Sequence, residues 1–456
     1  MNLEFDKELV SLGELFRLQG GRLFVVGGHV RNSLLGLPVS DTDVTSRLRP
    51  EEVIGLCQGA GYKVVPKGIA FGMVEIHIGG RVYEHTTFRS DSYSEGGAHR
   101  PESVRFSDTP EEDAFRRDFT VNALYADVLT GGLVDPTGGM ADLNKKLIRA
   151  TSADPRTILG DDGLRIMRLC RFAAELGFDI EEKTLAAAKE CAVLLKDISA
   201  ERIRDELLKI LMSDVKYGLP AEESVLRGLE LLDEVGVFGV ILPELAACRG
   251  VEQSKKYHRF PVLEHMERTA AMSAPEQALR LACLFHDAAK PIMLEKQGNM
   301  HGHDALSADM TRDILTRLRF DTKTVDEAVW LVAHHMFDLD GNAKEPTLKR
   351  RFVHWGKERS YALCLIREAD FRGSVGGYIE VKTAERWRRV LHEMEESGTP
   401  FSEKELAVTG EELMAHLDLK PSPKIGEIKK ALLMHTAVKP KDNTKEKLLA
   451  AARDLI

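Results

Sequence analysis

Residues 23–31 read Leu-Phe-Val-Val-Gly-Gly-His-Val-Arg, and residues 40–44 read Ser-Asp-Thr-Asp-Val. The first stretch predicts a buried strand that breaks at Gly27–Gly28 and enters a helix. Such a turn lets the backbone approach an anion, and the helix N-terminus supplies free N–H groups. A strand in the second stretch would place Asp41 and Asp43 on one face, because side chains alternate with a period of two. This pair of carboxylates suits Mg²⁺, which prefers oxygen ligands and bridges protein carboxylates to substrate phosphates.

Each of these motifs is common by itself. A Gly-Gly pair after a strand is usually a tight turn, and Asp-x-Asp is usually a solvated turn. Their combination within one short segment, thirteen residues apart, makes them informative. Glu84 lies in the next strong strand and is either a third carboxylate or an exposed polar position.

The composition is that of an ordinary globular protein. The chain has 456 residues, 43% hydrophobic and 30% charged, which excludes disorder, collagen and a coiled-coil rod. No window holds eighteen consecutive apolar residues, and the first residues are charged, so we expect neither a membrane-spanning helix nor a signal peptide. Six scattered cysteines without a CxxC pair predict reduced thiols and a cytoplasmic location. With a net charge of −9, any nucleic-acid contact requires a local basic face.

Hydrophobic periodicity divides the chain into an α/β part and a helical part. Strands are expected at 23–26, 62–65, 73–78 and 81–88, and helices near 5–17, 29–36 and 50–59. From about residue 155 the strand signals vanish, and 164–176, 183–195 and 200–212 show helical spacing.

The run Gly27-Gly-His-Val-Arg-Asn-x-Leu-Leu-Gly36, followed by Asp41-x-Asp43, resembles the first motif of bacterial tRNA nucleotidyltransferases and poly(A) polymerases, the class II branch of the nucleotidyltransferase superfamily. The family usually has Asp where this chain has Asn32. The resemblance implies that Asp41 and Asp43 are catalytic and hold Mg²⁺, and that Gly27, Gly28 and Arg31 bind the nucleotide.

Residues 116–123 read Arg-Arg-Asp-Phe-Thr-Val-Asn-Ala and resemble the second motif of this family. In isolation, a structural ion pair of the two arginines with Glu111 or Glu112 would be the simpler interpretation. The resemblance implies instead that Arg116 and Arg117 approach the triphosphate, because a guanidinium binds phosphate oxygens in a bidentate manner. It also implies that Asp118 and Asn122 organise the sugar and the site.

Residues 161–172, Asp-Asp-Gly-Leu-Arg-Ile-Met-Arg-Leu-Cys-Arg-Phe, are expected to open a long helix with an Asp161–Arg165 pair in its first turns. An ordinary salt-bridged helix would look the same. The string also resembles the family motif in which the second acid and the first Arg, here Asp162 and Arg165, form hydrogen bonds with the incoming base; Arg168 belongs to the same nucleotide-binding set. Cytosine and adenine carry the exocyclic amine that Asp162 would accept from, whereas uracil does not.

Two further segments resemble parts of the family. Residues 135–143, Asp-Pro-Thr-Gly-Gly-Met-Ala-Asp-Leu, are similar to a small hinge motif whose glycines would let head and neck rotate. The polar, Gly-rich segment 89–101 is similar to a flexible loop that is associated with the addition of the final A, so it favours full CCA addition.

Eight of the fifteen histidines fall between residues 258 and 354. An adjacent His-Asp on a helix, with further His and Asp at helix-scale distances, predicts a divalent-metal cage. The order resembles the HD phosphohydrolase superfamily, which implies a first metal shell of His265, His286, Asp287 and Asp370. His303 and His334 would hold a second ion, with His335 as the rival of His334. Imidazole ligands favour a transition-metal or similar divalent ion at this site.

We therefore expect an α/β nucleotidyltransferase head with a mainly antiparallel sheet, followed by an all-α neck, an HD-type body and a helical tail. The expected limits are 1–150 for the head, 151–250 for the neck, 251–400 for the body and 401–456 for the tail. In the tail, residues 417–456 hold nine Lys or Arg against five Asp or Glu. This basic stretch is either a solvated helical face or a surface that holds the acceptor arm of tRNA.

The resemblance implies template-independent addition of C, C and A to the 3′ end of tRNA from CTP and ATP, with release of pyrophosphate. An A-adding enzyme and a poly(A) polymerase share the head motifs and remain open. A third alternative is a phosphohydrolase that acts at the HD site and carries a degenerate tRNA-binding head. The sequence indicates no membrane partner and identifies no protein partner.

Overall fold

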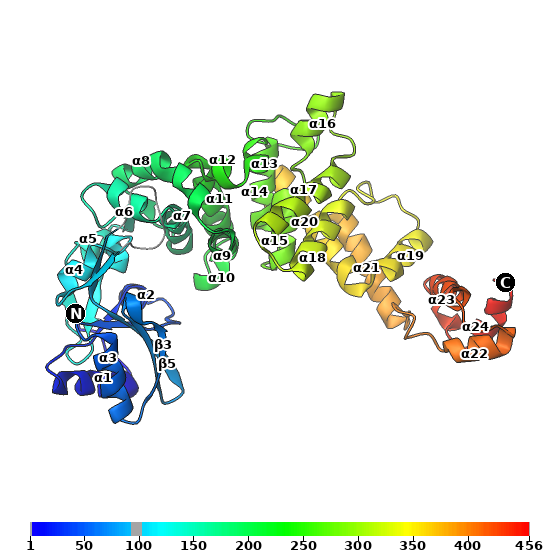
Figure 1. The fold of residues 1–456 in the computed structure, drawn as a ribbon. Coiled ribbons are helices and arrows are strands. Elements are labelled where there is room, and N and C mark those ends of the chain that lie inside the picture. Colours follow the sequence, from blue (N-terminus) through cyan, green and yellow to red (C-terminus); the bar gives the residue numbers. More distant parts are fainter. Residues whose placement is uncertain (1, 93–102, 456) are drawn as a thin grey trace. The chain divides into compact units, whose positions relative to one another are not determined.

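The computed structural model describes residues 2–92 and 103–455 (Figure 1). The chain divides into two compact units, Met1–Ala246 and Ala247–Ile456. Among the described residues, none of the helices combines the length and the apolar character that a bilayer span requires.

The first unit begins with a seven-stranded sheet whose strand order is β3-β4-β5-β2-β1-β8-β9. All neighbouring strands in it are antiparallel except β2 and β5, which are parallel. The strands are β1 (Phe24–Val26), β2 (Asp43–Ser46), β3 (Lys63–Gly68), β4 (Met73–Ile78), β5 (Arg81–Thr87), β8 (Tyr125–Asp127) and β9 (Leu133–Val134). In β4, buried and half-buried residues alternate, as expected for a sheet with one covered face.

Helices and short segments complete the sheet part of this unit. They are α1 (Lys7–Leu18), α2 (Gly28–Leu35), α3 (Pro50–Gly59), η1 (Ile69–Phe71), α4 (Pro110–Ala114), η2 (Thr120–Asn122) and α5 (Gly139–Asn144). A separate ribbon pairs β6 (Arg89–Ser92) with β7 (Ser103–Phe106). Most of the predicted loop 89–101 therefore lies outside the described residues, and its described start is a strand.

The rest of the first unit is helical apart from one small parallel pair, β10 (Leu147–Ile148) with β11 (Asp179–Ile180). Its elements are α6 (Pro155–Asp161), α7 (Leu164–Leu176), α8 (Glu182–Cys191), η3 (Ala192–Asp197), α9 (Ala200–Leu211), α10 (Ser213–Tyr217), η4 (Glu222–Leu226), α11 (Arg227–Glu234), α12 (Val237–Ile241) and α13 (Pro243–Ala246). Helix α7 packs on α9, α10 and α11 and is buried along most of its length.

The second unit is helical throughout its described residues. Helices α14 and α20 pack together at its centre, with α15 and α18 beside them. The elements are α14 (Val262–Met272), α15 (Gln277–Phe285), α16 (Lys290–Gln297), α17 (His303–Arg317), α18 (Thr322–His334), α19 (Glu345–Trp355), α20 (Lys357–Val375), α21 (Lys382–Glu396), α22 (Gly410–Leu417), α23 (Pro423–Thr436), η5 (Pro440–Asp442) and α24 (Lys445–Arg453).

This architecture confirms the predicted fold class, an α/β head with a mainly antiparallel sheet followed by helices. One local prediction is wrong. Asp161 is the last residue of α6, Asp162 has an extended backbone, and α7 begins only at Leu164. The two acidic residues therefore form a break between two helices and do not open α7.

Candidate active site and metal centre

A cavity of about 1200 Å³ lies within the first unit, between its sheet and its helices. Its lining includes every head and neck residue that the sequence singled out: Gly27, Gly28, Arg31, Asp41, Asp43, Arg116, Arg117, Asp118, Asn122, Asp162, Arg165 and Arg168. Residues from motifs more than a hundred positions apart thus face one space.

The Gly27–Gly28 turn forms one wall of this cavity at the start of α2. Gly27 has a φ of 76°, a conformation that residues with a side chain rarely adopt. A Cβ on Gly28 would lie 3.7 Å from Nη2 of Arg31. The turn leaves space beside the Arg31 guanidinium and beside the free N–H groups at the start of α2. Such an arrangement binds anions.

Three carboxylates from adjacent strands face the same cavity. Asp43 is the first residue of β2, Asp41 lies two residues before it, and Glu84 of β5 is the register partner of Asp43. Partial burial raises the pKa of Asp43, Arg117 opposes this, and Asp41 raises it further. Burial and Asp43 likewise raise the pKa of Glu84. Mutual repulsion between carboxylates is relieved by a bound cation, so these donors fit Mg²⁺.

Arg116 and Arg117 are both held by Asp113, a fully buried residue of α4. Arg116 Nε donates to Asp113 Oδ1 at 2.7 Å, and Arg117 Nη2 donates to Asp113 Oδ2 at 2.9 Å. Burial raises the pKa of Asp113, but the two guanidinium groups outweigh it and hold that pKa well below its usual range. The ion-pair partner suggested by the sequence, Glu111 or Glu112, is therefore replaced by Asp113.

Asp162 and Arg165 stand at the helix break described above. Asp162 accepts hydrogen bonds from the backbone of Leu164 at 3.0 Å and from Nη2 of Arg202 at 2.6 Å. Arg165 donates to the carbonyl oxygens of Ile158 at 2.6 Å and Arg116 at 3.0 Å. Both side chains are thus fixed by contacts with other elements while they line the cavity.

Sequence reasoning missed the cavity residues that α7, α9 and α10 supply: Arg171, Arg202, Lys209, Lys216 and Tyr217. Arg171 pairs with Glu206 at 2.6 Å and with Glu175 at 3.1 Å. The three-residue spacing of Arg165, Arg168 and Arg171 was a usable signal for Arg171. The remaining four residues, Arg202, Lys209, Lys216 and Tyr217, have no local sequence feature that distinguishes them from residues on an exposed face of a helix.

The segment predicted to be a hinge is anchored by hydrogen bonds within itself. Asp135 accepts hydrogen bonds from the backbone N–H groups of Gly139 at 2.7 Å and Met140 at 2.9 Å. A Cβ on Gly139 would lie 2.2 Å from the carbonyl oxygen of Thr120. Gly139 therefore permits close backbone packing with Thr120, and the rotation of head and neck stays a prediction.

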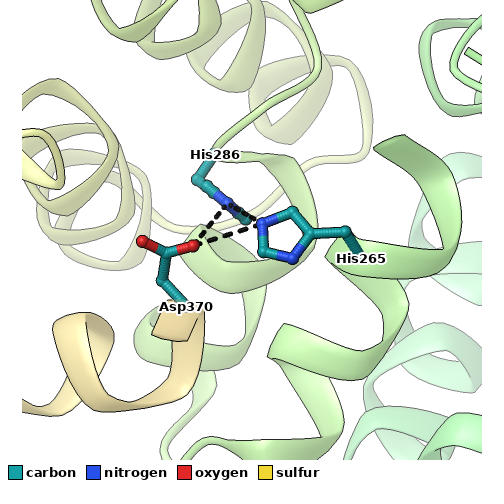
Figure 2. A group of neighbouring side chains, drawn as sticks. All are labelled: His265, His286 and Asp370. Carbon is teal, nitrogen blue, oxygen red and sulfur yellow. Dashed lines mark hydrogen bonds and ion pairs between the residues drawn. The ribbon is translucent and has the colours of Figure 1, made fainter. Parts of the chain in front are cut away.

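The second unit contains a buried cluster of imidazoles and carboxylates (Figure 2). His265 Nε2 lies 3.0 Å from His286 Nε2 and 3.2 Å from Asp370 Oδ1. His265, His286 and Asp370 offer atoms close enough together for one metal ion, and His286, Asp287 and His335 form a second such group. Helices α14 and α20 and the turns that follow α15 and α18 bring these residues together.

Backbone carbonyl groups orient the imidazoles of this cluster. Nδ1 of His286 lies 2.8 Å from the carbonyl oxygen of Cys283, and Nδ1 of His303 lies 2.7 Å from that of Met300. Nδ1 of His335 lies 2.6 Å from the carbonyl oxygen of Val332. An Nδ1–H that donates to a carbonyl leaves Nε2 to face the cluster, which is the usual arrangement of metal-binding histidines.

The predicted ligand His334 does not belong to the cluster. Its ring stacks on Trp330 with the centroids 4.3 Å apart, and its Nδ1 lies 2.8 Å from the Trp330 carbonyl oxygen. The next residue, His335, has the inward position, with Nε2 3.2 Å from His303 Nε2 and 3.8 Å from Asp287 Oδ1. The helix ends at His334, and this fixes which of the two neighbours faces inward.

The charges of the cluster are strongly coupled. Burial lowers the pKa of His286, but Asp287 and Asp370 outweigh it and raise the pKa to about 10. Burial lowers the pKa of His335 to about 3, with His286 adding to the effect. Burial raises the pKa of Asp287, yet His286 and Lys290 hold it well below its usual range. Close Nε2 atoms beside carboxylates of low pKa fit a divalent metal ion, which would bind His286 in its deprotonated form.

Comparison with known families covers most of the chain. Residues 23–149 match the poly(A) polymerase head domain, and 177–249 match the "Probable RNA and SrmB- binding site of polymerase A". Residues 257–370 match the HD domain, and 384–452 match tRNA nucleotidyltransferase domain 2.

The relatives agree with these matches. A CCA-adding enzyme of Streptococcus gordonii is 32% identical over 431 residues, which cover 94% of this chain and 92% of that protein. An A-adding tRNA nucleotidyltransferase of Deinococcus radiodurans is 31% identical over 432 residues, 90% of each chain. The Bacillus stearothermophilus CCA-adding enzyme, solved in complex with CTP, superposes with a TM-score of 0.71 at 26% identity and covers 98% of this chain and 96% of its own. With this identity over almost its entire length, the chain belongs to the bacterial tRNA nucleotidyltransferase and poly(A) polymerase family, in the form that carries an HD domain.

Proposed function

We propose that this protein adds C, C and A to the 3′ end of tRNA, using CTP and ATP and releasing pyrophosphate. The observation that carries the proposal is the single cavity that unites the carboxylate pair, the arginines and the Asp162–Arg165 pair. Its volume of about 1200 Å³ exceeds that of a typical small-molecule pocket, so it has room for a nucleoside triphosphate and an RNA end together.

The proposed reaction joins the 3′-hydroxyl oxygen of the RNA to the α-phosphorus of the nucleotide and breaks the bond from that phosphorus to the bridging oxygen. Asp41 and Asp43 would hold two Mg²⁺ ions, which when bound lower the pKa of the attacking hydroxyl group and neutralise the leaving pyrophosphate. Arg116 and Arg117, which Asp113 holds in place, would direct positive charge toward the phosphates.

In this proposal, Asp162 and Arg165 select the base of the incoming nucleotide. Asp162 would accept a hydrogen bond from the exocyclic amine of cytosine or adenine, and Arg165 would donate to ring or carbonyl acceptors. The basic residues of α9 and α10, Lys209 and Lys216, extend the cationic lining toward the RNA backbone. In this proposal the head spans 1–150, the neck 151–250, the HD body 251–400 and the tail 401–456, and residues 417–456 contact the tRNA acceptor arm.

Primer extension tests the proposal. Three tRNA substrates that lack CCA, CA or A would be incubated with CTP, ATP or both, beside Asp41→Ala. Addition that stops at CCA on all three substrates supports the proposal, and Asp41→Ala should abolish it. Extension of only the substrate that lacks A would make this an A-adding enzyme like the Deinococcus relative, and long A tails would make it a poly(A) polymerase.

We propose a second activity, metal-dependent phosphoester hydrolysis, at the His265–His286–Asp370 cluster. The close approach of imidazole Nε2 atoms and carboxylates supports it. The ligand types favour Mn²⁺, Ni²⁺ or Co²⁺ over Mg²⁺ alone. Hydrolysis of bis(p-nitrophenyl) phosphate by the metal-loaded protein should be lost in His286→Ala and retained in Asp41→Ala. If only this activity is found in the wild type, the head is a degenerate binding module.

A further inference from the structure

The two aspartates of the active-site cavity are held in different ways. Asp43 is the first residue of β2 and is paired in the sheet with Val26. Asp41 and Thr42 precede the strand and belong to the segment 37–42, which is neither helix nor strand. The sheet therefore fixes Asp43 directly, whereas the position of Asp41 depends on the contacts that hold this segment.

Helix α2 holds the segment through two side chains that lie on one of its faces. The amide nitrogen of Asn32 donates to the carbonyl oxygen of Pro38 at 2.8 Å. Nδ1 of His29 lies 2.9 Å from Oγ1 of Thr42, which is a hydrogen-bonding distance. His29 and Asn32 are three residues apart, so they share a face of the helix. The helix thus contacts the segment near its start and at its end.

The His29–Thr42 contact lies directly beside the carboxylates. Thr42 stands between Asp41 and Asp43 in the chain, and all four residues line the cavity. The His29 ring also packs near Phe5, with the ring centroids 5.8 Å apart, and this contact limits its movement. Burial lowers the pKa of His29, so the ring is neutral at neutral pH and does not repel a cation.

We propose that His29 is a positioning residue for the carboxylate pair, which holds Asp41 beside Asp43 through Thr42 so that both can bind Mg²⁺. Helix α2 begins at the Gly27–Gly28 turn, so one helix carries the proposed phosphate-binding turn and also sets the spacing of the proposed metal ligands. This inference rests on the proposed use of the cavity for nucleotidyl transfer.

The test removes the contact from each side. Thr42→Val replaces the hydroxyl group with a methyl group of similar size, and His29→Ala removes the imidazole. Thr42→Ser keeps the hydroxyl group and is the conservative variant. Thr45→Val is the matched control, because the hydroxyl group of Thr45 donates to the carbonyl oxygen of Thr86 in β5 at 2.6 Å.

Two measurements report on the metal ligands. Calorimetry of CTP binding to the protein without tRNA, first in EDTA and then at increasing Mg²⁺ concentrations, gives the gain in CTP affinity that Mg²⁺ provides. Addition of one nucleotide to a tRNA primer gives the Mg²⁺ concentration at half of the maximal rate. Thermal unfolding shows whether each variant is folded. If His29→Ala does not fold, Thr42→Val carries the test.

We expect Thr42→Val and His29→Ala to require about five-fold more Mg²⁺ in both measurements, the effect of losing one neutral hydrogen bond. Their affinity for CTP in EDTA should match that of the wild type. The double variant should require no more Mg²⁺ than the poorer single variant, because both changes remove the same contact. Thr42→Ser should require less Mg²⁺ than Thr42→Val, and Thr45→Val should keep the wild-type requirement.

An unchanged Mg²⁺ requirement in Thr42→Val overturns the inference. A loss of rate that is equal at every Mg²⁺ concentration also overturns it, because the contact would then only support the fold. Additive effects of the two changes overturn it as well, since the residues would then act through separate contacts. If the wild type itself neither binds CTP nor extends a tRNA primer, the proposed function fails, a result distinct from these.

Discussion

Arg168 donates two hydrogen bonds to a single oxygen of Asp118, from Nε at 2.8 Å and from Nη2 at 2.6 Å. The contact joins α7 to the segment that follows Arg116 and Arg117. Burial raises the pKa of Asp118, but Arg168 outweighs it, and the pKa falls from 3.8 to about 2.

Because folding depresses the pKa of Asp118, its ion pair stabilises the protein above the unfolded pKa near 4, and this stabilisation is lost as the pH falls toward 2. The shift corresponds to about 2 kcal/mol. Asp118→Asn should therefore lower the free energy of unfolding by about that amount at pH 7, and the difference should shrink between pH 4 and pH 2. Urea unfolding followed by circular dichroism measures this. A difference that does not change with pH would contradict the assignment.

Arg202 holds both carboxylate oxygens of Asp162, at 2.6 and 3.3 Å, and so keeps this acceptor in place. We predict that Arg202→Ala reduces the preference for CTP over UTP about ten-fold. Without Arg202, the Asp162 carboxylate is no longer held where it accepts a hydrogen bond from the exocyclic amine of cytosine. Single-nucleotide incorporation with each triphosphate measures the ratio. The matched control is Arg204→Ala, from the same helix, where Arg204 pairs with Asp205. A uniform loss of rate with an unchanged ratio would mean that Arg202 has only a structural role.

The neighbouring residues His334 and His335 should differ in their effect on metal content. His335→Ala removes an imidazole that faces the cluster and should weaken Mn²⁺ binding by at least ten-fold. His334→Ala removes a ring that stacks on Trp330 outside the cluster and should leave Mn²⁺ binding unchanged. Elemental analysis after dialysis against Mn²⁺ measures both variants. Retention of the full metal content by His335→Ala would show that His335 is not a ligand.

Metal uptake by the second unit should release protons. With a pKa of about 10, His286 is protonated in the metal-free protein at neutral pH, and metal binding requires its deprotonated form. Affinity for Mn²⁺ should therefore rise as the pH increases from 6 to 9. Calorimetry in two buffers of different ionisation enthalpy should show the release of about one proton, and identical heats in both buffers would refute it.

The sequence predicted local structure well where periodicity is strong. The strand over 73–78 has its predicted limits, and the helical spacing of 164–176 coincides with α7, because each repeats its apolar residues at the period of one structure. The break at Asp162 was missed. The adjacent Gly163 packs closely on the backbone of Leu194, where a Cβ would lie 3.1 Å away. Such long-range packing leaves no periodic signal.

The active site shows the same difference between features that a local pattern predicts and features that long-range packing creates. Motif residues such as Asp43 and Arg117 could be identified because several chemical groups occur at a fixed spacing. Tyr217 could not, since it contributes through a contact with Asn32 that tertiary packing creates. Asp113 lies only three and four residues before Arg116 and Arg117, and the sequence interpretation chose Glu111 or Glu112 in its place. The choice between His334 and His335 depended on where one helix ends, which sequence patterns locate only to within a residue or two.

Gly139 has one more consequence, for the lining of the active-site cavity. A Cβ at this position would lie 2.2 Å from the carbonyl oxygen of Thr120, and the same short segment carries Asn122, which lines the cavity. Gly139→Ala should therefore displace this segment and alter the lining of the cavity from a position outside it.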